Sequence, residues 1–129
     1  MAPFIRTGIC SYGMSGKLFH APFIQAHPGY ELSAIVERHN HDSKERYPDA
    51  KLYRSVEELC ADTDLQLIVV NTPTHLHFEQ AKIVLQAGKH LVIEKPFAVV
   101  VDVIFVRKPV GWKYSVAGWF IRMYYQIAG

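Results

Sequence analysis

The chain contains little cysteine and no group of residues with the spacing of a metal site. Cys10 and Cys60 lie far apart in a chain of 129 residues, with no Cys-x-x-Cys or mixed Cys/His pattern near either. This argues against a disulfide framework and against zinc. The pairs His39-x-His41 and His75-x-His77 lack a third ligand, so we expect surface or cleft histidines there. We predict no metal and a reducing, cytoplasmic location.

The sequence also lacks a charge excess of one sign and any long apolar run. Its 14 basic and 12 acidic residues give a formal charge of +2 and are spread along the chain, which argues against nucleic-acid binding. The N-terminus has no signal-peptide core, and the late apolar run 114–121 is bounded by Lys113 and Arg122. We therefore predict a protein with no nucleic-acid or membrane partner that handles a small-molecule substrate.

What is present is an alternation of short apolar runs with helical patterns. Each apolar run lacks polar alternation, as expected of strands that are covered on both faces. Strands that alternate with helices predict a parallel sheet with right-handed crossovers. We expect an α/β, doubly wound (Rossmann) fold. The expected strands are 4–10, 32–36, 52–53, 65–70 and 91–93, and the expected helices are 17–26, 43–47, 56–61 and 78–87.

The last quarter of the chain has a different composition. After Pro96 there is a single acid, Asp102, while both tryptophans and half of the aromatic residues fall in this part. We predict a nucleotide-binding domain over 1–98 and an atypical basic and aromatic tail over 99–129. We expect an ordered tail whose strand, 99–106, joins the sheet or pairs with another chain, the latter making a homo-oligomer.

A glycine-containing turn follows the first strand. The pattern Ser11-x-Gly13-x-x-Gly16 resembles the dinucleotide fingerprint with its first glycine replaced by serine. Glu37 ends the next strand about 20 residues on, where a ribose contact is expected. Arg38 is placed to stack on adenine or face a 2′-phosphate, so both NAD and NADP remain open, with NAD slightly favoured. The alternative is a packing turn and a surface glutamate.

Five segments together resemble the Gfo/Idh/MocA oxidoreductases and cover nearly all of residues 4–98. They are Ser-Tyr-Gly-Met-Ser-Gly-Lys-Leu-Phe-His-Ala-Pro-Phe-Ile at 11–24, Ile-Val-Glu-Arg at 35–38, Asn-Thr-Pro-Thr-His-Leu-His at 71–77, Ala-Gly-Lys-His at 87–90 and Glu-Lys-Pro at 94–96. Any one of them can arise by chance, but the five occur in the family's order.

The resemblance implies a role for each matched segment. The glycine turn would hold pyrophosphate, Glu37 and Arg38 would lie near the adenosine ribose, and Thr72-Pro73 would line the cleft. Lys95 would lie beside nicotinamide and the substrate hydroxyl and assist proton movement during hydride transfer. The predicted cofactor-binding residues are Ser11, Tyr12, Gly13, Met14, Gly16, Glu37, Arg38, Asn71, Thr72, Pro73, His77, Glu94 and Lys95, with Lys95 also the catalytic residue.

The expected activity is NAD(P)-dependent oxidation or reduction of a sugar, polyol or related compound. Family members continue into a second α/β domain that supplies acid–base residues, and we expect mainly the nucleotide-binding part here. Truncation, a reading-frame change and a real alternative ending remain open as the origin of the tail. A non-catalytic nucleotide-binding or oligomerisation module is the alternative. A third hypothesis, a Rossmann-like domain for another adenosine ligand, follows from Ser11 in place of glycine.

Overall fold

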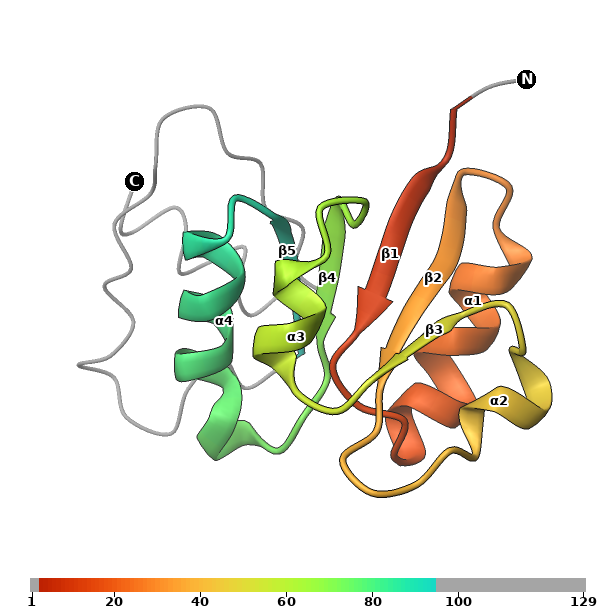
Figure 1. Cartoon of the computed structure of the whole chain (residues 1–129), viewed down its shortest axis with the longest axis horizontal. Coiled ribbons are helices and arrows are strands. Elements are labelled where there is room, and N and C mark those ends of the chain that lie inside the picture. Colours follow the sequence, from red (N-terminus) through yellow and green to blue (C-terminus); the bar gives the residue numbers. More distant parts are fainter. Residues whose placement is uncertain (1–2, 95–129) are drawn as a thin grey trace.

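The computed structural model describes residues 3–94, which form strands alternating with helices (Figure 1). The elements predicted from the sequence are present within a few residues of their expected bounds. The strands are β1 (Ile5–Ile9), β2 (Tyr30–Val36), β3 (Lys51–Tyr53), β4 (Leu67–Val70) and β5 (His90–Ile93). The helices are α1 (Ala21–Ala26), α2 (Ser43–Arg46), α3 (Val56–Ala61) and α4 (His77–Gln86), with a π-helical turn η1 (Gly16–His20) and a 3-10 turn η2 (Thr74–Leu76).

The strands form a single parallel sheet in the order β3-β2-β1-β4-β5. This order confirms the predicted doubly wound α/β fold. The chain leaves β1 toward β2 on one side and later returns to β4 on the other, so the order reverses between β1 and β4. Ligands of such sheets bind beyond the carboxyl ends of the strands at this reversal.

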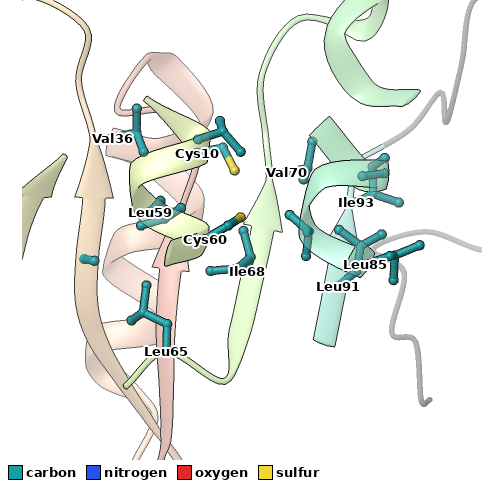
Figure 2. Close-up of a cluster of buried hydrophobic side chains, with 14 residues drawn as sticks. Cys10, Val36, Leu59, Cys60, Leu65, Ile68, Val70, Leu85, Leu91 and Ile93 are labelled. Atoms are coloured by element: carbon teal, nitrogen blue, oxygen red, sulfur yellow. The ribbon is translucent and has the colours of Figure 1, made fainter. Parts of the chain in front are cut away.

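Helices α3 and α4 cover one face of the sheet and bury the larger apolar cluster (Figure 2). Leu59 of α3 and Val84 of α4 are fully buried against Ile68 and Val70 of β4. The short, nearly all-apolar strands follow from this arrangement, because a central strand must present apolar side chains to both faces.

The opposite face, over β1 and β2, is covered by α1 together with Tyr47 and Ala50 of the segment that follows α2. Its core includes Ile9, Ile35 and Ala21, together with Val69 of β4. A second hollow, of about 340 Å³, lies farther along this face. Its lining is mainly apolar and consists of Thr7, Phe19, His20, Phe23, Ile24, His27, Tyr30, Leu67, Val69 and Val92.

Local sequence signals explain two helix ends. Ser55 begins α3, and its Oγ accepts a hydrogen bond from the Glu58 N–H at 3.1 Å, as the Ser-x-x-Glu pattern predicts. The Glu58 carboxylate accepts from the Arg54 N–H instead of the cap residue's own. Gly88 follows α4 with φ +80°, a conformation that favours glycine at a helix end.

None of the helices within residues 3–94 is long and apolar enough to cross a membrane. The predicted tail, 99–129, and its strand, 99–106, lie outside the described residues, as does Lys95. The domain boundary at 98 and the homo-oligomer therefore stay predictions.

Candidate nucleotide-binding cleft

A cavity of about 420 Å³ lies at the reversal of the strand order, beyond the carboxyl ends of β1, β2 and β4. Its volume is within the range of small-molecule sites. Three segments form most of its wall: the turn after β1, the end of β2 and the segment after β4. The lining residues are Cys10, Ser11, Tyr12, Gly13, Val36, Glu37, Arg38, His39, Asn40, Thr72, Pro73, His75 and Leu76.

The turn after β1 is closed by Ser11. Its Oγ accepts a hydrogen bond from the Gly13 N–H at 3.1 Å, a local bond typical of serine in turns. Gly13 is exposed and lines the cavity, and a Cβ there would meet only the Ser11 Oγ, at 3.3 Å. Replacing the first fingerprint glycine by serine therefore leaves a closed turn with an open glycine facing the cleft.

Gly16 has a different role from Gly13. It is buried, and a Cβ at this position would lie 2.3 Å from the Ser11 carbonyl oxygen and 3.2 Å from the Asn71 Nδ2. Asn71, 5% exposed, donates from this Nδ2 to the same Ser11 oxygen at 2.8 Å. Asn71 at the end of β4 therefore braces the turn after β1, and Gly16 leaves room for this brace.

Asn71 also leaves one buried acceptor free. Its Oδ1 has no hydrogen-bond partner among the described residues, and it belongs to the side chain that braces the glycine turn. Buried polar atoms without a partner are rare in native proteins and call for a ligand, a water or a function. The open glycine turn fits a phosphate group, and the Asn71 Oδ1, which lies outside the cavity lining, can accept only from a donor such as a hydroxyl or a water.

The end of β2 places Glu37 at the edge of the cavity but turns its carboxylate toward α2. Glu37 is 8% exposed, and its Oε2 accepts from the Ser43 N–H at 3.1 Å and from the Ser43 Oγ at 2.6 Å. Arg54 donates from Nη1 to the carbonyl oxygens of Glu37, at 3.0 Å, and of Asn40. The loop that carries Arg38 is thereby fixed, while the Arg38 side chain is exposed.

Tyr12 forms an aromatic wall of the cleft. Its ring packs edge-on against Tyr47 with the centroids 6.2 Å apart, and the Lys17 Nζ lies 5.5 Å from its centroid. Lys17 also lies 3.8 Å from the Asp42 carboxylate. Burial, followed by the nearby Tyr47 hydroxyl, raises the pKa of Tyr12. Tyr12 is therefore a neutral phenol at physiological pH. Met14, in the same turn, is exposed and outside the lining of the cavity.

The segment after β4 is held by α4. His77, 1% exposed, bonds through Nε2 to the Thr72 carbonyl oxygen at 2.6 Å, and the Thr72 hydroxyl bonds to the Gln80 side chain. Thr72 and Pro73 face the cavity, whereas the buried His77 lies behind them. Its position therefore supports an indirect role, holding the cleft wall.

The end of β5 is joined to the helix that follows the glycine turn. The His20 Nε2 and the Glu94 Oε1 lie 2.5 Å apart, and both side chains are partly buried. The Glu94 N–H donates to the Val70 carbonyl oxygen at 3.1 Å, which continues the pairing of β5 with β4 by one residue. The residue that precedes Lys95 is therefore fixed at the same sheet edge as the cleft.

The two cysteines are free, buried thiols. Burial raises the pKa of Cys10 well above its usual range and the pKa of Cys60 to about 11. Both are therefore protonated at neutral pH, and a nucleophilic role for Cys10 in the cleft is not supported. Among residues 3–94, no three His, Cys, Asp or Glu side chains are grouped so that they could hold a metal ion.

The structure brings most of the predicted cofactor residues to one cleft and separates a few from it. Those in the lining are Ser11, Tyr12, Gly13, Glu37, Arg38, Thr72 and Pro73. Gly16, Asn71 and His77 support the wall from behind. Cys10, Val36, Asn40 and Leu76 line the cleft without having been predicted, and only their positions next to a strand end could have indicated them.

Comparison with known proteins agrees with this geometry. The family model described as an oxidoreductase family with an NAD-binding Rossmann fold, Gfo/Idh/MocA, matches residues 5–106. The chain belongs to the Gfo/Idh/MocA family. Its described residues form the NAD(P)-binding domain of these oxidoreductases.

Individual relatives share this domain. The scyllo-inositol 2-dehydrogenase (NADP(+)) IolW of Bacillus subtilis is 39% identical over 92 residues, which are 71% of this chain and 26% of that enzyme. The UDP-N-acetylglucosamine 3-dehydrogenase of Acidithiobacillus ferrooxidans is 35% identical over 95 residues, 72% of this chain and 29% of that enzyme.

Solved structures give the same result. A crystal structure of a Bacteroides fragilis protein assigned as an oxidoreductase is 46% identical with a TM-score of 0.83, and the match covers 91% of this chain and 38% of that one. The 3-ketoreductase KijD10 of Actinomadura kijaniata, solved with NADP and TDP-benzene, is 28% identical with a TM-score of 0.67. That match covers 75% of this chain and 30% of KijD10. The chain thus spans between about a quarter and two fifths of these relatives.

Proposed function

We propose that this chain binds a nicotinamide dinucleotide in the cleft beyond β1, β2 and β4, as part of an oxidoreductase acting on a sugar, polyol or inositol. The observation that carries the proposal is the convergence of the glycine turn, the end of β2 and the Thr72-Pro73 segment on one cavity. The Gfo/Idh/MocA relatives support the substrate class, since they include dehydrogenases of an inositol and of a nucleotide sugar.

Different residues bind different parts of the cofactor. The open backbone at Gly13 admits the pyrophosphate, and Tyr12 and Arg38 flank the adenosine. The bound cofactor supplies or accepts the hydride at its nicotinamide ring. Ser11, Asn71 and His77 hold the walls, so that the cofactor meets a site already formed.

Lys95 is the residue that we assign to proton movement. Glu94, fixed by His20 and by the Val70 carbonyl, precedes it directly at the sheet edge. An ammonium at this edge can donate a hydrogen bond to the substrate oxygen and move its proton as the carbonyl forms or is reduced. This role needs a substrate held beside it, and effective catalysis requires both reactants in fixed geometry.

Calorimetric titration of the full chain with NADH, NADPH and ATP tests the proposal. We expect saturable binding of at least one nicotinamide dinucleotide and no comparable binding of ATP. Absence of dinucleotide binding would overturn the proposal. Tighter binding of ATP would favour a domain for another adenosine ligand.

The alternative is cofactor binding without turnover. It is kept because the chain matches 26% and 29% of two dehydrogenases, whose printed activities belong to the whole enzymes. Assay of NAD(P)H formation over a panel of polyols and inositols decides between the two. Turnover that disappears in Lys95→Ala supports the oxidoreductase, and binding without turnover supports the alternative.

A further inference from the structure

We infer that Ser43 holds the Glu37 carboxylate toward α2 and that the cleft consequently selects NADP over NAD through Arg38. The inference rests on the proposed function and deepens it by naming the cofactor. It reverses the slight preference for NAD expected from an acidic residue at the end of β2.

The Glu37 carboxylate is already hydrogen-bonded within the protein. A carboxylate that recognises the two ribose hydroxyls of NAD offers an oxygen to each hydroxyl. Here Oε2 already accepts two hydrogen bonds from Ser43, at 2.6 and 3.1 Å, and the residue is 8% exposed. Only the Glu37 Oε1 is left without a hydrogen bond from the described residues, so a carboxylate that offers one oxygen to each hydroxyl would have to break the Oε2 bonds.

The loop after Glu37 presents an exposed cation, Arg38, to the cleft. Arg38, His39 and Asn40 are exposed and line the cleft directly after Glu37. Within residues 3–94, the Arg38 guanidinium has no hydrogen bond or ion pair. A planar guanidinium with free donors matches the geometry and charge of a phosphate group.

Hydrogen bonds from Arg54 fix the position of this loop. Arg54 donates to the carbonyl oxygens of Glu37 and Asn40, at the two ends of the segment that carries Arg38. The Asp42 carboxylate, the next acidic group along the chain, lies beside Lys17 at 3.8 Å. The Asp42 carboxylate therefore has a cationic partner, the Glu37 carboxylate is turned to Ser43, and the exposed Arg38 is the cation that a 2′-phosphate would meet.

Binding of adenosine fragments to the full chain tests the selection without any substitution. Adenosine 2′,5′-bisphosphate should bind at least about tenfold more tightly than AMP, as should NADPH compared with NADH. Arg38→Ala should reduce both ratios to near one, and this exposed position leaves the fold intact.

Comparison of two serine-to-alanine variants tests the role of Ser43. Ser43→Ala removes the shorter bond to Glu37 and should strengthen NADH binding, so that the NADPH-to-NADH affinity ratio falls by about threefold or more. Ser33→Ala is the matched control, because the Ser33 hydroxyl also donates to a glutamate carboxylate on β2, that of Glu31 at 2.8 Å, outside the cleft lining. The ratio should stay unchanged in this control.

The outcomes separate the inference from the proposed function. Equal or tighter binding of NADH by the unmodified chain overturns the inference and leaves the proposed function standing. An unchanged ratio in folded Ser43→Ala overturns the role of Ser43. Failure to bind any dinucleotide overturns both proposals. If Ser43→Ala does not fold, the fragment comparison and Arg38→Ala decide the selection.

Discussion

At the residue scale, the two glycines of the turn have separable roles. Gly13 is open to the cleft, whereas a Cβ at Gly16 would lie 2.3 Å from a backbone oxygen that cannot move freely. The dinucleotide pattern thus combines one glycine that serves the ligand with one that serves the packing of helix and strand.

This separation gives the first prediction. Gly13→Val should fold with nearly normal stability but weaken NADPH binding by at least about tenfold, because the branched side chain occupies the pyrophosphate path. Gly16→Ala should lose about 1–3 kcal/mol of unfolding free energy, because the turn must shift to admit the methyl group. Urea denaturation and calorimetry measure the two effects. If Gly13→Val and Gly16→Ala lowered the free energy of unfolding equally, the assignment of Gly13 to ligand binding and Gly16 to packing would be wrong.

Lys89 shows that a charged residue of a family motif can be structural. It is 7% exposed, and its Nζ donates to the carbonyl oxygens of Asp62 at 2.5 Å and Leu65 at 2.9 Å. The ammonium therefore closes the connection between α3 and β4, far along the chain from Lys89 itself. The sequence could not indicate this, because lysine is almost always exposed.

We predict that Lys89→Met lowers the free energy of unfolding by about 1–3 kcal/mol, since two buried carbonyl groups lose their donor. Lys82→Met, at an exposed position of α4, is the control and should change stability by less than about 0.5 kcal/mol. Urea denaturation checks both. Similar stability of the two variants would rule out the closing role of Lys89.

At the element scale, the α3–β4 connection is organised around Asp62. Its carboxylate accepts hydrogen bonds from the Tyr53 hydroxyl at 2.7 Å, the Lys51 Nζ at 3.1 Å and the Asp64 N–H at 2.9 Å. Burial raises the pKa of Asp62, but these hydrogen bonds outweigh burial and bring the pKa below its ordinary value. The charged form is therefore favoured in the folded state.

This shift predicts an acid-dependent stability. The contribution of Asp62 is fully present above its unfolded pKa of about 3.9 and is lost as the pH falls through the lower folded pKa. Asp62→Asn should lower the free energy of unfolding at neutral pH and should make this free energy depend less on pH in the acid range. The exposed Asp64→Asn should leave the curve nearly unchanged. The test is the urea midpoint of unfolding measured at pH values between about 3 and 7, a range that includes carboxylate titration. Parallel plots of midpoint against pH for wild type and Asp62→Asn would contradict the prediction.

A second prediction at this scale concerns the link between η1 and β5. The His20–Glu94 bond joins two elements that are distant in the sequence, at 2.5 Å. His20→Ala and Glu94→Gln should show a coupling energy of about 1 kcal/mol in a double-mutant cycle measured by urea denaturation. Additive effects of the two substitutions would show that the bond does not stabilise the end of β5.

The sequence predicted the elements better than it predicted the directions of their side chains. Strands such as β4 are readable because an apolar run between polar segments must be buried. The π-helical turn η1 was expected as ordinary helix, since its hydrogen-bond shift leaves no local pattern. The two hydrogen bonds from Ser43 to Glu37 connect the end of β2 to the start of α2, six residues later. No sequence motif indicates such a pair, so these bonds could not be predicted.

At the scale of the whole molecule, the sheet order decides where the site lies. Parallel pairing brings the ends of β1, β2 and β4 to one edge, so residues near 11, 37 and 72 meet although they are distant in sequence. The resemblance located the cleft residues, but the burial of His77 and Asn71 behind the wall required the packed structure. The Gfo/Idh/MocA match covers the domain that holds this cleft.

Hydrogen exchange of the full chain with and without saturating NADPH tests the central claim most directly. We expect slower exchange in the glycine turn, in the loop after β2 and in the segment after β4, with little change in α3. Protection confined to other segments, or the absence of any protection at saturating cofactor, would contradict the placement of the dinucleotide in this cleft.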